Sequence, residues 1–355
     1  RMGYINNAPN PKLRWEKTRD VKVALDFGLW KDRINGIVEA YWRKSKDCVT
    51  SEYVPVTTGF FNQSYNTSVL QNNGVEFSLS VAVLKSKDYN LSVSANVAWN
   101  QNKLKKYNSP NTSLALDKYV GYPMGAVFSG KYEGIDPETG MYKFKLRPDA
   151  VTNKDGYLRE PNNYYYYLGT SVAPFTGGFN LNFSYKNIGL SVGGSYSVKA
   201  KMVDNIESPA GYELLSGSKL ESIPTPHNDL YRNHLNVKRE VRNRWTPENR
   251  TGVKYPRLID AYGKKLGLDL TNPTLTTITR GALLEDISCL RINTIALSYS
   301  LPQRVLERIN FSSAALNLTL NNFFTITKYS GIDPEVPGAT YPVSRSVTIG
   351  LNVGF

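Results

Sequence analysis

The sequence lacks the features that mark several common classes of protein. Its 355 residues contain no run of about 18 apolar residues, which excludes a membrane-spanning helix but not a membrane-spanning β-barrel. Its two cysteines, Cys48 and Cys289, are too few for a disulfide framework and lack metal-site spacing, so we expect two small apolar side chains. Residues 1–10 hold no signal peptide, and the abrupt opening suggests a fragment or a mature piece of a longer protein.

Catalytic signatures are also missing. The sequence has no G-x-x-x-x-G-K-[ST] phosphate loop, no H-E-x-x-H zinc motif and no C-x-x-C pair. Ser216 and Lys219 form a bare S-x-x-K without the companion motifs of that enzyme class, which indicates a chance match. His227 and His234 lie in a loop with Asp229, and a solvated or hydrogen-bonded pair explains them better than metal ligation. We therefore expect neither an enzyme nor a cofactor.

What the sequence does have is a two-residue alternation. In the last ten residues, 346–355, apolar side chains occupy the odd positions and polar or small ones the even positions, and the final residue is Phe355. That period is typical of a β-strand with two unlike faces. The same alternation predicts further strands at about 21–29, 34–43, 75–83, 89–100, 179–186, 188–198, 286–300 and 316–326.

The predicted connections alternate between short and long. The short ones are 31–33, 85–88, Asn187 and a moderate link at 302–311 with room for one helical turn; the long ones are 48–73, 107–174, 203–285 and 328–345. In an up-and-down meander, every second connection lies at the same end, so the short turns share one rim with Phe355. Transmembrane barrels have short periplasmic turns, long external loops and strands of about ten residues or more. Strands of soluble sandwiches are usually about 5–6 residues long.

The predicted fold class is therefore all-β, a transmembrane antiparallel up-and-down β-barrel. Backbone N–H and C=O groups find no water in hydrocarbon, so they must pair between strands, and only a closed sheet leaves no edge. The apolar column then faces lipid, and the Asn, Ser, Thr and Gly column faces a wet lumen. The strand at 286–300 is less regular, because alternation places Arg291 and Asn293 on the face of Ile295, Leu297 and Tyr299. Nine clear strands is an odd count, so we expect more barrel before the first residue or strands within the long connections.

Several strings, kept in order along essentially the whole chain, resemble one family, the SusC/RagA-like TonB-dependent transporters of the outer membrane. The strings are PNPKLRWEKT (9–18), LDFGL (25–29), TTGF (57–60), NNGVEF (72–77), GIDPETG (134–140), RWTPEN (244–249), TKYSGIDPE (327–335) and VGF (353–355).

The resemblance implies a roughly 22-stranded barrel with a plugged lumen. Residues 1–355 would be its C-terminal part, about nine or ten strands, and the plug domain and TonB box would lie outside this chain. Such transporters sit in the outer membrane of Gram-negative bacteria and import oligosaccharides or peptides, driven through TonB. Their implied partners are a SusD-like surface lipoprotein that acts as a lid, the remaining N-terminal barrel and plug, and the barrel-assembly machinery, which reads a terminal aromatic such as Phe355.

Aromatic side chains provide the candidate ligand contacts. Tyr164, Tyr165, Tyr166 and Tyr167 fall in a long connection, and aromatic faces stack on sugar rings or pack against peptide side chains. Packing within the loop or against a lid protein would explain the same four residues. Trp245, in the string 244–249, is a further candidate for ligand contact.

Charged groups are concentrated in the connections of this chain, whose net charge is +13. Residues 231–257 are strongly basic, which suits a solvated loop, lipopolysaccharide phosphates beside the outer-membrane lipid, an anionic cargo or the lid. Nucleic acid is not expected, because no aromatic platform is interleaved with the basic residues. Gly-Ile-Asp-Pro-Glu recurs at 134–138 and 331–335, where a turn is the simplest explanation. Asp136 and Glu138 are weak metal candidates, because calcium needs more oxygen ligands than two carboxylates supply.

The function predicted from the sequence is TonB-dependent active import of a nutrient oligomer together with a SusD-like lid. Two alternatives remain from other classes: a passive outer-membrane porin, and a soluble β-sandwich adhesin or binding module. The sequence does not distinguish a glycan cargo from a peptide cargo.

Overall fold

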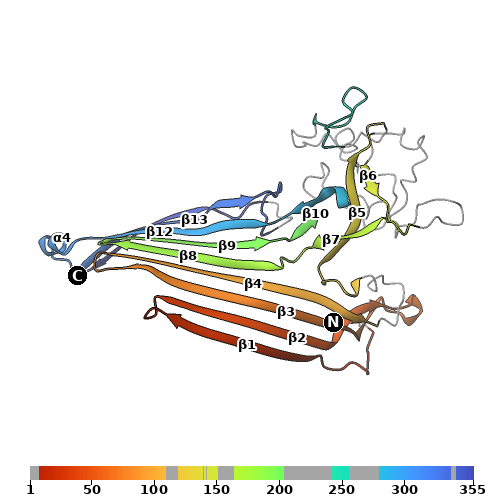
Figure 1. Ribbon diagram of the computed structural model, residues 1–355, viewed down its shortest axis with the longest axis horizontal. Helices are drawn as coiled ribbons and strands as arrows, with labels where there is room; N and C mark the ends of the chain where they lie inside the picture. The colour runs from red at the N-terminus through yellow and green to blue at the C-terminus, as the bar shows by residue number, and fades with distance from the viewer. Residues whose placement is uncertain are drawn as a thin grey trace, which may run out of the picture.

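The computed structural model describes residues 8–108, 119–138, 140, 142–150, 164–203, 242–255, 280–336 and 341–355. Among these residues, nine strands form one sheet in which each strand pairs antiparallel with the next, an up-and-down meander (Figure 1). The strands are β1 (Lys17–Leu29), β2 (Ile34–Tyr53), β3 (Asn62–Lys85), β4 (Tyr89–Tyr107), β8 (Phe175–Tyr185), β9 (Ile188–Val198), β12 (Cys289–Ser300), β13 (Ser313–Thr327) and β14 (Ser346–Gly354).

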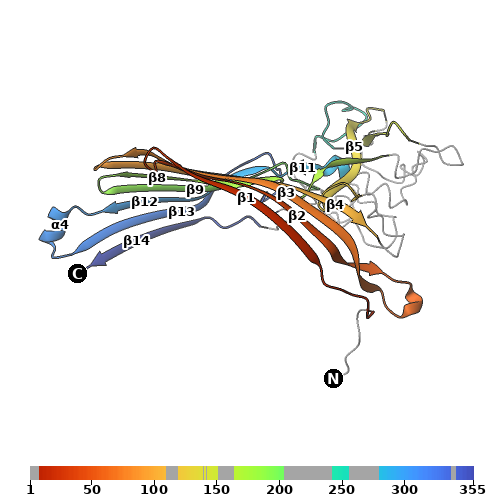
Figure 2. The ribbon, with the colours of Figure 1, turned by 60° about the horizontal axis from the view of Figure 1, so that its bottom comes forward.

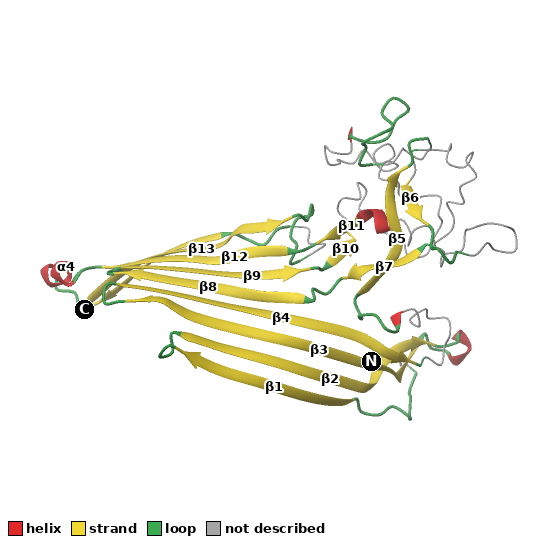
Figure 3. Cartoon of the chain, viewed as in Figure 1, coloured by secondary structure: helices red, strands yellow, loops and turns green. Residues whose placement is uncertain are grey.

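The sheet is long, twisted and curved, with β1 and β14 at its two edges (Figure 2). The helical elements bounded within the described residues are short: η1 (Val56–Thr58), η6 (Arg280–Leu283) and α4 (Gln303–Arg308) (Figure 3). In this part of the chain, no helix has both the length and the apolar character needed to span a membrane. Since α4 lies in the predicted link 302–311, the expected helical turn is confirmed.

The strands keep the predicted alternation, and their apolar side chains are exposed rather than packed in a core. In β14 the side chains of Ile349 and Leu351 are 72% and 66% exposed, and Val21, Val23 and Leu25 of β1 are similarly exposed. Hydrophobic burial within the sheet is correspondingly small, so the strands are held mainly by their backbone ladders. An apolar face of this extent marks a surface that contacts a membrane or a protein.

The connections are sorted between the two ends of the sheet as predicted. The β1–β2, β3–β4 and β8–β9 turns, helix α4 and the C-terminus lie at one end, which we call the short-turn rim (Figure 1). The remaining connections lie at the opposite end, the long-loop rim. In the β1–β2 turn, Trp30, Lys31 and Asp32 all have positive φ, and the side-chain amide of Asn35 donates to the carbonyl of Asp32 at 2.8 Å.

The predicted loop at 48–73 is wrong, because most of it is strand. β2 continues to Tyr53 and β3 begins at Asn62, so only residues 54–61 connect them. The paired residues of this hairpin are largely polar, for example Thr50 opposite Tyr65 and Glu52 opposite Gln63. The apolar alternation ends here although the hydrogen-bonded ladder continues, which indicates a hairpin that projects beyond the apolar band.

Strands also occur within the long connections, but in the described residues they form separate small sheets and add no strand to the nine of the main sheet. The connection predicted at 107–174 contains β5 (Ala126–Ile135), β6 (Tyr142–Lys145) and β7 (Tyr165–Thr170), which form a separate three-stranded sheet in the order β6-β5-β7. In the next connection, β10 (Lys201–Val203) pairs with β11 (Leu284–Asp286). Both small sheets lie at the long-loop rim (Figure 1).

A β-bulge at Asn293 overturns the predicted face of Arg291. Arg291 pairs with Ser195 of β9, but Ile295 pairs with Val192, and the register shifts between Ile292 and Thr294. One extra residue in a strand moves every later side chain to the other face. Arg291 therefore lies on the polar face with Ser195, opposite to Ile295, and not on the face of the apolar residues that follow it.

Candidate functional site

A pocket of about 540 Å³ lies at the long-loop rim, beside the part of β4 that extends beyond β8. The β4–β8 ladder ends where Trp99 pairs with Phe175, so the part of β4 after Trp99 pairs with other segments on that side. The backbone N–H of Asn100 donates to Pro174 at 2.9 Å, and the N–H of Leu104 donates to Tyr122 at 2.8 Å. These bonds hold the segments 121–125 and 170–174 against β4, and we call the space enclosed between them the rim pocket.

Two tyrosine rings line the rim pocket. The centroids of Tyr122 and Tyr167 lie 4.9 Å apart at an interplanar angle of 41°, and Phe128 packs against both rings. Tyr167 remains 42% exposed. Burial, with a smaller contribution from Tyr122, raises the pKa of Tyr167 above its ordinary value, so its phenol is neutral at physiological pH.

Amide side chains form the polar part of the same pocket. The Asn102 side chain donates to the Asn72 side-chain oxygen at 2.8 Å and accepts from the backbone N–H of Met124 at 2.8 Å. The side-chain oxygen of Asn100 is buried and accepts no hydrogen bond within the described part of the protein. Of the described residues that line the pocket, Lys103 alone carries a charge.

The four tyrosines predicted to contact a ligand do not all lie at the rim pocket. Tyr164 precedes β7 and the other three lie on it, and Tyr167 is the member that lines the rim pocket. The hydroxyl of Tyr166 donates to the carbonyl of Leu146 at 2.9 Å, so this ring braces the neighbouring segment. Ligand contact by the quartet stays a prediction, strongest for Tyr167.

Trp245 joins two of the strings that carry the family resemblance. Its side chain is only 6% exposed, and its indole N–H donates to the carbonyl of Pro137 at 3.0 Å. In the string of Pro137 (134–140), the Asp136 side chain accepts from the backbone N–H of Glu138 at 2.9 Å, which forms a turn. The described residues contain no group of three or more His, Cys, Asp or Glu side chains placed to hold a metal ion. His227 and His234, with residues 231–241 and 256–257 of the basic run, lie outside the described residues.

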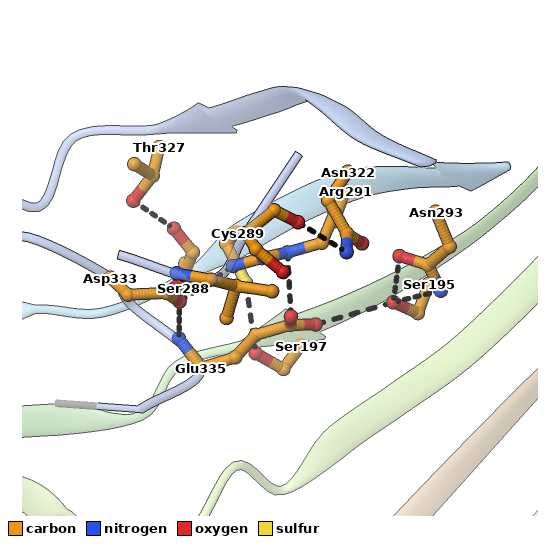
Figure 4. Close-up of polar contacts among 12 residues, drawn as sticks. Ser195, Ser197, Ser288, Cys289, Arg291, Asn293, Asn322, Thr327, Asp333 and Glu335 are labelled. Atoms are coloured by element: carbon orange, nitrogen blue, oxygen red, sulfur yellow. Dashed lines mark hydrogen bonds and ion pairs between the residues drawn. The ribbon is translucent and has the colours of Figure 1, made fainter. Parts of the chain in front are cut away.

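The second Gly-Ile-Asp-Pro-Glu copy forms the same turn and adds a buried ion-pair cluster (Figure 4). Asp333 accepts from the backbone N–H of Glu335 at 2.9 Å, as Asp136 does from Glu138. Arg291 Nη2 lies 2.5 Å from Asp333 Oδ1, and Arg291 Nε lies 2.6 Å from Glu335 Oε2. We call Arg291, Asp333 and Glu335 the Arg291 anchor, because these three residues tie the β13–β14 connection to the polar face of β12.

The surroundings of the anchor favour its charged form. Burial by itself would raise the pKa of Asp333, but the N–H of Glu335 and the Arg291 guanidinium outweigh burial, so the pKa lies below its ordinary value. Ser195 of β9 donates to Glu335 at 3.2 Å and also contacts Asn293, the bulge residue. The cluster was not among the predicted sites, although the sequence carries a signal for it: the Gly-Ile-Asp-Pro-Glu string is repeated, and Arg291 is the single charged residue of β12.

Phe355 lies at the short-turn rim and is exposed. Its ring meets Phe311 edge-on with centroids 5.1 Å apart, and its carbonyl accepts from the Ser312 hydroxyl at 3.3 Å. Both cysteines are buried, reduced side chains, as expected.

The curated proteins that the chain resembles are all TonB-dependent receptors among those compared below. No family model matches the sequence. The chain is 25% identical over 386 residues to TonB-dependent receptor P26 of Formosa agariphila, covering 99% of this chain and 36% of the relative. It is 25% identical over 371 residues to TonB-dependent receptor SusC of Bacteroides thetaiotaomicron, covering 98% and 32%. The chain thus spans about a third of the length of the curated relatives that it matches.

Solved structures agree with this class. The RagAB peptide transporter matches with a TM-score of 0.74 at 26% identity, over 98% of this chain and 36% of that chain. The RagAB peptide importer in its "closed-closed" state matches with a TM-score of 0.76 over 99% and 37%. The fold is therefore part of a transmembrane antiparallel up-and-down β-barrel of the TonB-dependent transporter type. The resemblance of the chain to the C-terminal barrel portion of SusC/RagA-like transporters is confirmed. These relatives are receptors and transporters, not enzymes.

Proposed function

We propose that the protein imports a nutrient oligomer, an oligosaccharide or an oligopeptide, across the outer membrane of a Gram-negative bacterium in a TonB-dependent manner. The observation that carries the proposal is the match of nearly the whole chain, in sequence and in fold, to SusC and to RagAB. Residues 1–355 supply the C-terminal barrel wall. The plug domain and TonB box belong to the rest of the transporter, and TonB acts through that plug.

The two faces of the sheet support this placement. The exposed apolar column of β1 and β14 faces outer-membrane lipid, and the Asn, Ser and Gly column of β8 and β9 faces the lumen. The long-loop rim is the extracellular one, where a SusD-like lipoprotein closes over the mouth and lipopolysaccharide surrounds it. The short-turn rim is periplasmic, and Phe355 at this end is the aromatic read by the barrel-assembly machinery.

Uptake of labelled nutrient oligomers into intact cells tests the function. The full-length transporter is expressed in a parent strain, in a strain without TonB and in a strain without the lid lipoprotein. The proposal predicts that uptake is lost without TonB and strongly reduced without the lid. Uptake that persists without TonB would identify a passive porin, and extraction of the full-length protein without detergent would identify a soluble module.

A further inference from the structure

We propose that the rim pocket is a subsite for one neutral saccharide unit of the imported oligomer. The inference rests on the proposed import function and adds to it a location and a class of ligand. A volume of about 540 Å³ lies within the range of about 300–1,000 Å³ that is usual for small-molecule sites. The pocket lies at the long-loop rim, where an extracellular oligomer first meets the wall.

The aromatic part of the pocket suits a sugar ring. Tyr167 is partly exposed, and the rings of Tyr122 and Phe128 pack against it and fix its orientation. A rigid, partly exposed aromatic face offers contact area at little cost in conformational entropy, and the C–H groups of a saccharide ring pack flat against such a face. A peptide chain presents no comparable flat ring at every unit.

The polar part of the pocket suits hydroxyl groups. Asn72 uses its side-chain oxygen for Asn102, while its amide N–H groups and the exposed side chain of Gln101 make no hydrogen bond with described residues. The side-chain oxygen of Asn100, another lining residue, is buried and accepts no hydrogen bond from the residues that the structure describes. An unsatisfied buried acceptor is costly, and a hydroxyl that reaches it after a small side-chain rotation removes that cost. Because a hydroxyl both donates and accepts, a polyhydroxylated unit matches this mixture of groups.

The charge of the pocket separates a neutral saccharide from a peptide. The described lining includes Lys103 but no carboxylate, so it offers no partner to a peptide's amino terminus or basic side chains. Burying an unpaired ligand charge is unfavourable, whereas a neutral hydroxylated unit carries no such penalty. The charge of the whole chain, +13, also disfavours a cationic cargo.

Calorimetric titration of the purified full-length transporter in detergent tests the subsite. The probes are short neutral oligosaccharides of glucan, xylan, mannan and fructan type, with a mixture of short peptides as the opposing arm. Tyr167→Ala removes the ring and should weaken binding of the preferred saccharide about 3- to 10-fold. Tyr167→Phe keeps the ring and should bind nearly as the parent does. Tyr341→Ala, a change at an exposed tyrosine in the β13–β14 connection, is the matched control and should have no effect.

Each outcome bears on the subsite separately from import. Saccharide binding that is weakened by Tyr167→Ala and spared by Tyr341→Ala supports the proposal. Saccharide binding unchanged by Tyr167→Ala overturns the subsite, while TonB-dependent uptake can still hold. Binding of peptides alone, or of neither probe, overturns the saccharide assignment, whereas failure of the function itself is seen as uptake that needs no TonB.

Discussion

Arg291 of β12 and Asp333 of the β13–β14 connection form an ion pair from which water is excluded. The Nη2–Oδ1 distance is 2.5 Å, and the two side chains are 5% and 4% exposed although they are 42 residues apart in sequence. Glu335 adds a second carboxylate at 2.6 Å from Arg291 Nε. One buried guanidinium therefore holds the β13–β14 connection, at the long-loop rim, against the polar face of the sheet.

Replacing Arg291 should release that connection. In Arg291→Met, the Asp333 carboxylate would be left buried without its partner, which costs about 3–5 kcal/mol. Hydrogen exchange of the full-length protein should then show faster exchange at the backbone N–H groups of Glu335 and Val343, both of which donate to Asp333. Arg304→Met, at an exposed position of α4, is the control. Equal protection in Arg291→Met and the parent would show that the pair does not anchor the connection.

The anchor should also respond to acid in a defined direction. Because the folded-state pKa of Asp333 lies below its ordinary value of 3.8, the carboxylate stabilises the folded connection fully above that value. This stabilisation is lost as the pH falls from 3.8 through the lowered folded-state pKa. Protection of the Glu335 N–H, corrected for intrinsic exchange, should therefore persist at mildly acidic pH and fall only below 3.8. Asp333→Asn should abolish this step, and a midpoint above 3.8 in the parent would contradict the assignment.

The main sheet could be predicted from sequence because each strand shows the alternation of apolar and polar side chains within its own residues. Residues 188–198, for example, alternate cleanly and coincide with β9, and the terminal strand and the link around α4 were also predicted. The halves of β2 and β3 next to residues 54–61 were missed, because polar residues occupy both faces there, for example Thr50 on one face and Ser51 on the other, and alternation carries no signal. The ladder continues through backbone hydrogen bonds, to which a hydropathy pattern is blind.

The sites were harder to predict, because they join residues distant in sequence. The rim pocket requires β4, the segment 121–125 and Tyr167 to meet, and only Tyr167 was singled out in advance. The indole of Trp245 reaches Pro137, 108 residues away. The Arg291 anchor also depends on a bulge, since one inserted residue decides which face the arginine occupies.

Deleting Asn293 tests the bulge directly. Removal of this residue restores strict alternation, so either Arg291 must turn to the lipid-facing side or Ile295 and Leu297 must turn inward. The amount of folded, heat-modifiable barrel in the outer membrane should fall severely. Asn293→Ala keeps the residue count and should assemble close to normal levels. Normal assembly of the deletion variant would contradict the assigned faces.

A charge in the terminal strand should be tolerated on one face only. Ile349 lies on the exposed apolar face opposite Leu318, and Thr348 lies on the other face opposite Thr319. Ile349→Lys should destabilise the barrel by about 2–4 kcal/mol if this position lies near the middle of the bilayer. Thr348→Lys should cost far less, because its side chain faces water. Denaturant titration of the full-length protein in lipid vesicles, followed by heat-modifiable migration, would measure the difference.

The most direct test of a membrane-spanning wall uses two neighbouring residues of β14. A nitroxide label is attached at Leu351→Cys or at Asn352→Cys in the full-length transporter; Cys48 and Cys289 of this chain are buried and do not compete for the label. In lipid bilayers, oxygen dissolved in lipid should relax the label at position 351 and a water-soluble nickel complex the label at position 352. Equal accessibility of both positions to oxygen and to nickel would contradict the assignment of one face to lipid and the other to the lumen.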